Sequence, residues 1–132
     1  MTQHIIPVRI YYEDTDFSGN VYHAAYLKFF ERGRTELLRD LGIHHHELAS
    51  EGLAFAVRAM EIDFRAAARI DDLLEVSTEV AEMSGVRLVL NQTISREGVA
   101  VTSARVSVVT IKMSGGPARL PKALRQRLEP GA

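Results

Sequence analysis

Cysteine is absent from this chain of 132 residues. Its absence excludes disulfide bonds, thiolate metal sites and a cysteine nucleophile, and it is compatible with a reducing compartment. Residues 1–10 lack the apolar run of a signal peptide, and no apolar stretch approaches the ~20 residues of a membrane span. We therefore expect a cytoplasmic protein with no stable membrane insertion.

A strong excess of charge of either sign is also absent. The formal net charge is −1, which gives no general attraction to nucleic acid or to an anionic membrane surface. We expect no nucleic-acid partner, and a phosphate-bearing ligand would have to be held by a few placed basic side chains.

Internal repeats, low-complexity tracts and Pro/Gly/Ser-rich linkers are missing as well. The apolar fraction of 46% and the charged fraction of 25% are those of an ordinary soluble globular protein. The chain is therefore expected to form a single domain over residues 1–132. After a turn at residues 114–117, we expect only a short basic tail.

An amphipathic helix is predicted over residues 22–41. Its apolar positions recur three or four residues apart, at Tyr22, Tyr26, Phe29, Phe30, Gly33, Leu37 and Leu41. Charged residues fill the opposite face. Gly42 stands where a glycine would end the helix.

Strands are predicted where β-branched and aromatic residues gather, or where apolar and polar residues alternate. We expect them over residues 5–12, 60–65, 74–80, 88–94 and 99–111. The short separators predict antiparallel hairpins between the last four strands, at residues 66–72, 84–85 and 97–98.

The lengths of these elements suggest how they pack. A helix of ~20 residues and a strand of roughly nine or ten residues both span ~30 Å. One long helix lying in the curve of one antiparallel sheet would bury the apolar faces of both, which predicts an α+β fold. The last strand is apolar on nearly both sides, and one helix covers only one sheet face. The other face, or the sheet edge, is therefore expected to meet a second copy in a homo-oligomer.

Residues 11–23 form the most informative segment for function. This segment joins the first strand to the helix and holds three carboxylates, a glycine and a histidine within eleven residues. Backbone N–H groups at a helix N-terminus lack partners within the helix. A carboxylate beside such donors and an imidazole can attack or deprotonate water while a developing oxyanion is held. The same residue types also suit an ordinary turn and helix cap, which is the alternative interpretation.

A calcium site is rejected in this segment. The pattern Asp14-x-Asp16-x-Ser18-Gly19 matches the first half of an EF-hand loop, whose twelfth position must be a bidentate glutamate. That position is Ala25.

The run His44–His46 is also an unconvincing metal site. Neighbouring side chains on a helix or strand do not converge on one ion, so we expect a solvated loop at the helix end. The sequence also lacks a Gly-rich phosphate loop and a His-Glu-x-x-His spacing, and we expect no metal.

The stretch Val8–Asp16, followed by Gly19, Val21–His23 and Tyr26, resembles the opening motif of a family of hot-dog acyl-CoA thioesterases. This family is encoded with the bacterial Tol–Pal envelope system and is related to the 4-hydroxybenzoyl-CoA thioesterases. The similarity continues along nearly the whole chain, through Phe30–Arg32, Arg34–Glu36, Arg69–Asp72 and Leu120–Lys122.

The resemblance implies a hot-dog fold, in which a five-stranded antiparallel sheet wraps a long central helix, with the active site at a dimer interface. It implies that Asp16 is the catalytic carboxylate. It also implies that the backbone N–H of His23 polarises the thioester carbonyl, while the His23 side chain orients water or the carboxylate. Acyl-CoA is the implied substrate, and since coenzyme A is part of that substrate, no separate cofactor is expected.

Further residues are candidates for substrate binding. Those within or beside the motif are Tyr12, Asp14, Gly19, Val21 and Tyr22. Basic side chains could hold the CoA phosphates, and the candidates are Arg58, Arg65, Arg69 and Arg87. Each of these arginines also suits a solvent-facing strand position.

Several alternatives stay open at this point. Asp16 could attack the carbonyl to form an anhydride, or activate water as a general base. The chain could instead be a hot-dog enoyl-CoA hydratase or acyl dehydratase, or a non-catalytic module that binds an acyl carrier protein or an envelope complex. The sequence does not fix the acyl group, the choice between CoA and acyl carrier protein, or the choice between a homodimer and a homotetramer.

Overall fold

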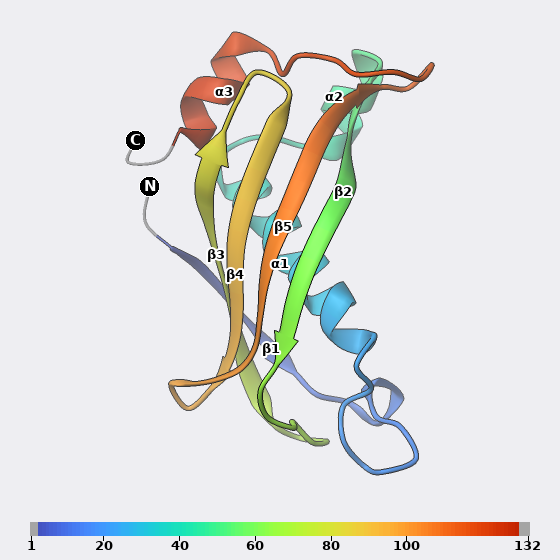
Figure 1. Cartoon of the computed structure of the whole chain (residues 1–132), viewed down its shortest axis with the longest axis vertical. Coiled ribbons are helices and arrows are strands. Elements are labelled where there is room, and N and C mark those ends of the chain that lie inside the picture. The colour runs from blue at the N-terminus through green and yellow to red at the C-terminus, as the bar shows by residue number, and fades with distance from the viewer. Residues whose placement is uncertain (1–2, 130–132) are drawn as a thin grey trace.

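Five antiparallel strands form one sheet in the order β1-β3-β4-β5-β2 (Figure 1). The computed structural model describes residues 3–129. The strands are β1 (His4–Arg9), β2 (Leu53–Phe64), β3 (Leu73–Met83), β4 (Arg87–Arg96) and β5 (Val99–Lys112). The helices are the 3₁₀ helix η1 (Tyr12–Asp14), α1 (Ala25–Asp40), α2 (His45–Ser50) and α3 (Lys122–Leu128). The predicted α+β arrangement of one long helix and five antiparallel strands is confirmed.

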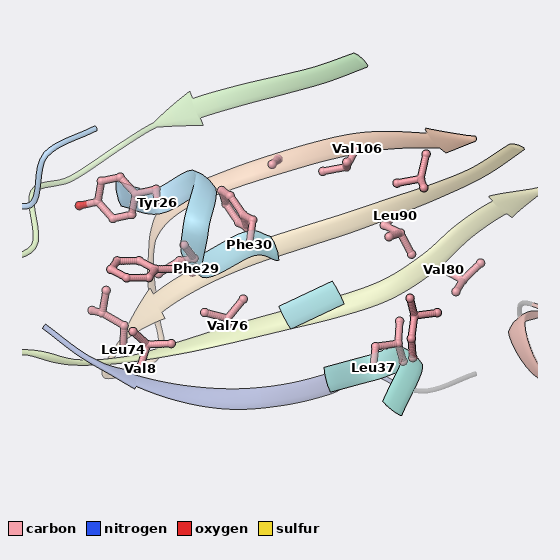
Figure 2. Packing of buried hydrophobic residues seen from close by; sticks show 14 of the residues in the cluster. Val8, Tyr26, Phe29, Phe30, Leu37, Leu74, Val76, Val80, Leu90 and Val106 are labelled. Atoms are coloured by element: carbon pink, nitrogen blue, oxygen red, sulfur yellow. The ribbon is translucent and has the colours of Figure 1, made fainter. Parts of the chain in front are cut away.

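Helix α1 packs on one face of the sheet, and the core lies between the two. In Figure 2, Phe29, Phe30 and Leu37 of α1 lie among strand residues that include Val76 and Leu90. The helical spacing of three and four residues and the strand spacing of two therefore contribute to a single core. Within residues 3–129, no helix combines the length and apolar composition that crossing a bilayer requires.

Gly33 lets α1 approach the sheet closely. A Cβ atom at this position would lie 2.8 Å from Thr78 Oγ1 and 2.9 Å from Val76 Cγ1. Polar contacts fix the helix at the same level, because Gln92 Nε2 donates to the Phe30 carbonyl and to Thr78 Oγ1, each at 2.9 Å. A larger residue at position 33 would therefore push the helix away from the sheet.

The end of α1 is the one that the sequence predicts. Gly42 has a φ of +77°, a left-handed conformation that favours glycine. The N–H of Ile43 donates to the Leu38 carbonyl at 2.8 Å and that of Gly42 donates to the Arg39 carbonyl at 3.0 Å. This is a Schellman motif, and it satisfies carbonyls that the helix leaves free.

Two boundaries before α1 differ from the prediction. The helix begins at Ala25 rather than Tyr22, because the Tyr22 N–H donates to the Asp14 carbonyl at 2.8 Å and so belongs to the preceding loop. The first strand ends at Arg9, and Tyr12 falls in η1.

The connection between β2 and β3 is not a hairpin, so the prediction at residues 66–72 is wrong. Strand β2 pairs with β5 at one edge of the sheet, and β4 separates β5 from β3. Residues 65–72 therefore cross the end of the sheet. Alternation shows which residues share a face, but it does not show which strand lies alongside. The hairpins predicted at residues 84–85 and 97–98 are confirmed.

The expected loop at His44–His46 and the expected basic tail each contain a short helix. Helix α2 has six residues and buries Leu48, while α3 has seven residues and buries Leu128. One buried leucine in so short a helix gives no periodicity from which it could be predicted.

The sheet face turned away from α1 is polar at its centre. A cross-strand row there consists of Glu79, Asn91, Arg105 and Glu61. The outer edge of β2, by contrast, has no neighbouring strand within residues 3–129 and exposes Val57 and Phe64. Of the two surfaces expected to meet a second copy, the β2 edge is therefore the more apolar.

Candidate active site

The loop between β1 and α1 lies near the end of the sheet where β2 stops (Figure 1). Thr15 and Val21 form an antiparallel bridge, and the Asp16 N–H donates to the Asn20 carbonyl at 2.9 Å. Gly19 has a φ of +85° and turns the chain without the steric cost that a Cβ would bring. The loop is therefore a short hairpin that carries Asp16 directly before its turn.

The Asp16 carboxylate is exposed and held in place by Ser18. Its Oδ1 accepts hydrogen bonds from the Ser18 N–H at 2.8 Å and from the Ser18 Oγ at 2.5 Å. These bonds outweigh the opposing effect of burial and, with a smaller contribution from His23, lower the pKa of Asp16 below its usual value. The carboxylate is thus ionised at neutral pH, and no group in residues 3–129 donates to its Oδ2.

His23 shares an open depression with Asp16. The His23 ring centroid lies 4.5 Å from that of Tyr22 and 6.3 Å from that of Phe64, which it meets edge to face. The depression is lined by residues from the loop, from the start of α1 and from the end of β2 and its connection, namely Asp16, Ser18, Asn20, Val21, His23, Tyr26, Phe64, Arg65, Ala66 and Ala67. The structure therefore brings the two predicted catalytic residues together.

Unpaired backbone donors lie beside these side chains. Within residues 3–129, no group accepts a hydrogen bond from the backbone N–H of His23 or Ala24. Both precede the first turn of α1, where no side chain caps the helix. The site thus combines an ionised carboxylate with free N–H groups at the positive end of a helix dipole.

The remaining loop residues predicted to bind substrate have different environments. Tyr12 is 82% exposed, whereas Val21 is buried in the core. Asp14 Oδ2 accepts the Tyr11 N–H at 2.8 Å and so caps η1. Gly19 forms the turn of the hairpin, and Tyr22 packs beside the His23 ring.

The arginines predicted to hold CoA phosphates do not gather at one place in this chain. Arg65 lines the depression, and Arg69 lies in the adjoining connection. Arg58 is exposed at a bulge within β2. Arg87 lies at the start of ten-residue β4, ~30 Å from the Arg96 end of that strand, and is 3.7 Å from Glu82.

A second cavity, of about 210 Å³, lies under the C-terminal half of α1. It is mainly apolar, with Leu38, Phe55 and Leu90 in its wall beside the half-buried Arg34. None of the predicted catalytic or substrate-binding residues lines it. The predicted catalytic residues Asp16 and His23 line the depression at the loop instead.

The histidines after α1 do not converge on an ion. The rings of His44 and His46 lie 5.8 Å apart, and within residues 3–129 no group of three or more His, Asp or Glu side chains is arranged to hold a metal.

Comparison with known proteins identifies the family. The sequence model of the Thioesterase-like superfamily matches residues 11–128. The chain belongs to the thioesterase-like superfamily. It is 46% identical over 124 residues to the acyl-CoA thioester hydrolase YbgC of Escherichia coli O157:H7, covering 89% of this chain and 90% of that protein. It is 45% identical over 121 residues to the acyl-CoA thioesterase YbgC of Haemophilus influenzae, covering 90% and 89% respectively.

Solved structures place the fold in the same superfamily. The crystal structure of a probable thioesterase from Bartonella henselae has a TM-score of 0.88 to this chain. The two are 46% identical, and the match covers 91% of this chain and 100% of that one. The five-stranded antiparallel sheet around a long helix is the hot-dog architecture, and the predicted fold class is confirmed.

Two residues of the candidate site are missed by sequence reasoning. Ser18 holds Asp16, and its signal is the Asp-x-Ser-Gly pattern, which suits a turn in which the aspartate binds the backbone two residues on. Phe64 packs against His23, and nothing in its strand pattern distinguishes it from a core residue.

Proposed function

We propose that this chain hydrolyses acyl-CoA thioesters to a free acid and coenzyme A, and that Asp16 drives the reaction. The observation that carries the proposal is the ionised, exposed Asp16 beside His23 and the unpaired N–H groups at the start of α1. The named activities of the YbgC relatives agree with this reaction.

Two routes are compatible with this arrangement. In one, an Asp16 oxygen attacks the thioester carbonyl and the C–S bond breaks, giving a mixed anhydride and a thiolate that takes up a proton. Water then cleaves the anhydride to release the acid and restore the carboxylate. In the other, Asp16 takes a proton from water as the water attacks, and the proton passes to the leaving sulfur.

In both routes a negative charge develops on the thioester oxygen. The N–H groups of His23 and Ala24 are free to donate to that oxygen, and the positive end of the α1 dipole lies at the same place. A donor of this kind contributes ~10²–10³ in rate. The His23 ring, on the same side, is suited to orient water or the carboxylate.

The coenzyme A moiety is proposed to be held by arginines in and around the depression, with Arg65 in its wall and Arg69 in the adjoining connection. Arg58 and Arg87 fit this role only if the thioester spans two subunits. No cofactor other than the substrate's own coenzyme A enters either route.

A homodimer formed through the β2 edge is proposed for this purpose. An unpaired strand edge readily adds a strand from another chain, and here it exposes Val57 at 50% and Phe64 at 49%. Phe64 lines the depression, so pairing at this edge would place a second copy next to Asp16. Sedimentation at several concentrations distinguishes monomer, dimer and tetramer.

The remaining expectations from the sequence and from the family resemblance also stay predictions. These are a cytoplasmic location, a connection with the Tol–Pal envelope system, and an acyl carrier protein as an alternative to coenzyme A. Pull-down of acyl carrier protein and fractionation of cells test them directly.

The proposal is tested by measuring thiol release from a panel of acyl-CoAs, from short to long aliphatic groups and one aromatic group. Asp16→Asn keeps the shape of the side chain and removes its charge, so we expect at least a ~10²-fold loss of turnover. Asp40→Asn is the matched control, because Asp40 is an exposed aspartate at the other end of α1. Turnover of Asp16→Asn within a few-fold of wild type would refute the role of Asp16.

The rival functions give different outcomes in the same experiment. A hydratase would add water to crotonyl-CoA without releasing thiol. A binding module would hydrolyse no acyl chain and would still bind an acyl carrier protein.

A further inference from the structure

The connection between β2 and β3 forms one wall of the proposed site. Its residues Ala66 and Ala67 line the depression that contains Asp16. The Ala68 carbonyl accepts the Val21 N–H at 2.8 Å, and Arg69 forms an antiparallel bridge with Asn20. The connection therefore holds the stretch of chain between Asp16 and His23.

Arg96, at the end of β4, ties this connection to the sheet. Its Nη1 donates to the Ala67 carbonyl at 3.0 Å and to Asp72 Oδ2 at 2.8 Å. Asp72 Oδ2 also accepts the Arg69 N–H at 2.9 Å. One guanidinium nitrogen and one carboxylate oxygen thus join both ends of the connection.

The pair is partly exposed and electrostatically matched. The Arg96 side chain is 37% exposed and that of Asp72 27% exposed. The Arg69 N–H, followed by the hydrogen bond and charge of Arg96, lowers the pKa of Asp72 below its usual value. Hydrogen bonds between charged groups are about twice as strong as neutral ones, which suits a pair that holds a loop.

Further contacts, besides those of Arg96 and Asp72, also hold the connection. The Ala68 N–H donates to the Tyr26 hydroxyl at 3.3 Å, a long bond. Asp71 has a φ of +73°, which is uncommon for a residue with a side chain, and its N–H donates to the Ile10 carbonyl at 2.9 Å. Residues 66–69 are therefore held by these contacts and by the Ala66 N–H bond to the Val101 carbonyl at 3.1 Å, and Arg96 adds the side-chain bond to the Ala67 carbonyl.

We propose that Arg96 and Asp72 are positioning residues for the Asp16–His23 site, an inference that rests on the proposed function. Neither side chain lines the depression, so neither is expected to touch the substrate. They act through Ala67, Ala68 and Val21 on the backbone that carries His23. Loss of the pair lets this backbone shift, and a misplacement of about 1 Å costs ~10² in rate.

The test compares Arg96→Met with the matched control Arg105→Met. Methionine keeps much of the apolar length and removes every donor. Arg105 also lies on a strand and forms an ion pair, 3.1 Å from Glu82, but on the sheet face turned away from α1. We expect Arg96→Met to lower kcat by about 10-fold to 10²-fold and to change KM by less than about two-fold. Arg105→Met is expected to keep the wild-type kcat.

Two further variants separate positioning from simple destabilisation. Arg96→Lys keeps a charge for Asp72 and cannot reach two acceptors in the same way, so it is expected to recover part of kcat. Asp72→Asn combined with Arg96→Met should lose little more than Arg96→Met alone, because both act through one contact. A kcat of Arg96→Met equal to that of wild type, in folded protein, overturns the proposal.

Amide resonances of Val21 and His23 provide a readout that does not need turnover. They are expected to shift in Arg96→Met and to stay in place in Arg105→Met. If the wild-type chain hydrolyses no thioester, the proposed function fails, and the resonances still decide whether Arg96 positions the loop. Unchanged resonances in Arg96→Met refute the positioning role.

Discussion

The two ends of helix α1 differ in whether their backbone polar groups are hydrogen-bonded. At the C-terminal end, the Schellman motif satisfies the carbonyls, and Arg127 Nη1 points to the carbonyls of Leu41 and Gly42 at 3.4 Å. Helices α2 and α3 lie at this end of the sheet (Figure 1) and seal it with Leu48 and Leu128.

At the N-terminal end, no side chain caps α1, and an exposed carboxylate lies beside N–H groups without acceptors. These backbone N–H groups stay available to bind another molecule, whereas the carbonyls at the C-terminal end already accept hydrogen bonds. The groups that stabilise α1 therefore lie at one end of the helix and the candidate reactive groups at the other, so the two ends can be tested separately.

The largest expected effect is that of Asp16→Asn, which should impair activity at the N-terminal end of α1 and leave the packing at its C-terminal end intact. Turnover is expected to fall by at least ~10²-fold, as for loss of a general base. The melting temperature should stay close to that of wild type, because the carboxylate is exposed and an asparagine oxygen can still accept the Ser18 hydrogen bonds. A parallel fall in melting temperature would show that the two ends are not separate.

The converse change is Leu128→Ala, in the packing at the C-terminal end of α1. Leu128 is fully buried, so the variant is expected to lose about 2–5 kcal/mol of unfolding free energy. Denaturant titration measures the loss, and specific activity at a temperature where the variant is folded should equal that of wild type. Reduced specific activity in the folded variant would contradict the separation.

A smaller loss of stability is expected from Gly42→Ala. The left-handed conformation at Gly42 costs a residue with a Cβ about 1–2 kcal/mol, and the new Cβ would also lie 3.3 Å from Arg127 Nη1. Thermal unfolding measures the effect. Gly52→Ala is a useful control, since it has a similar φ of +76° and nothing within 4 Å of a Cβ, so only the backbone cost should remain.

The smallest effect is that of Ser18→Ala on the pH dependence. The Ser18 hydroxyl lowers the pKa of Asp16, so its removal raises that pKa toward the ordinary value. Because the proposed reaction uses the ionised form, the acidic limb of kcat/KM should move to higher pH. Ser50→Ala, which removes a hydroxyl bonded to the Glu47 carbonyl in α2, should leave the limb unchanged. An unmoved limb in Ser18→Ala would mean that Asp16 does not set it.

The sequence predicts α1, β3, β4 and β5 well because their apolar spacing is long and regular. It predicts only residues 60–64 of β2, because residues 53–57 are apolar without alternation. The segment with Asp16 and His23 is singled out by its residue types and by the family resemblance, and its catalytic role stays a prediction. The sequence does not predict the crossing of residues 65–72 over the end of the sheet, because pairing between β2 and β5 is decided by packing of the whole sheet. Arg96 reaches the site only through that crossing, so no local pattern could reveal it.

Ser18 shows the opposite case. Its Asp-x-Ser-Gly pattern suits both the first half of a calcium loop and a tight turn. In this loop Ser18 donates two hydrogen bonds to Asp16, as in a turn. The short helices α2 and α3 each depend on one buried leucine, which is too little for recognition from sequence.

The missing side chain at Gly33 has a consequence for how this enzyme can diversify. Helix α1 rests directly on the Thr78 and Val76 side chains and cannot be lowered further, and any added carbon would lift it together with its N-terminal end. The height of the reactive groups above the sheet is therefore fixed by contact between the two elements. New substrate preferences in descendants of this chain should arise through the loops and strand edges around α1, while position 33 stays glycine.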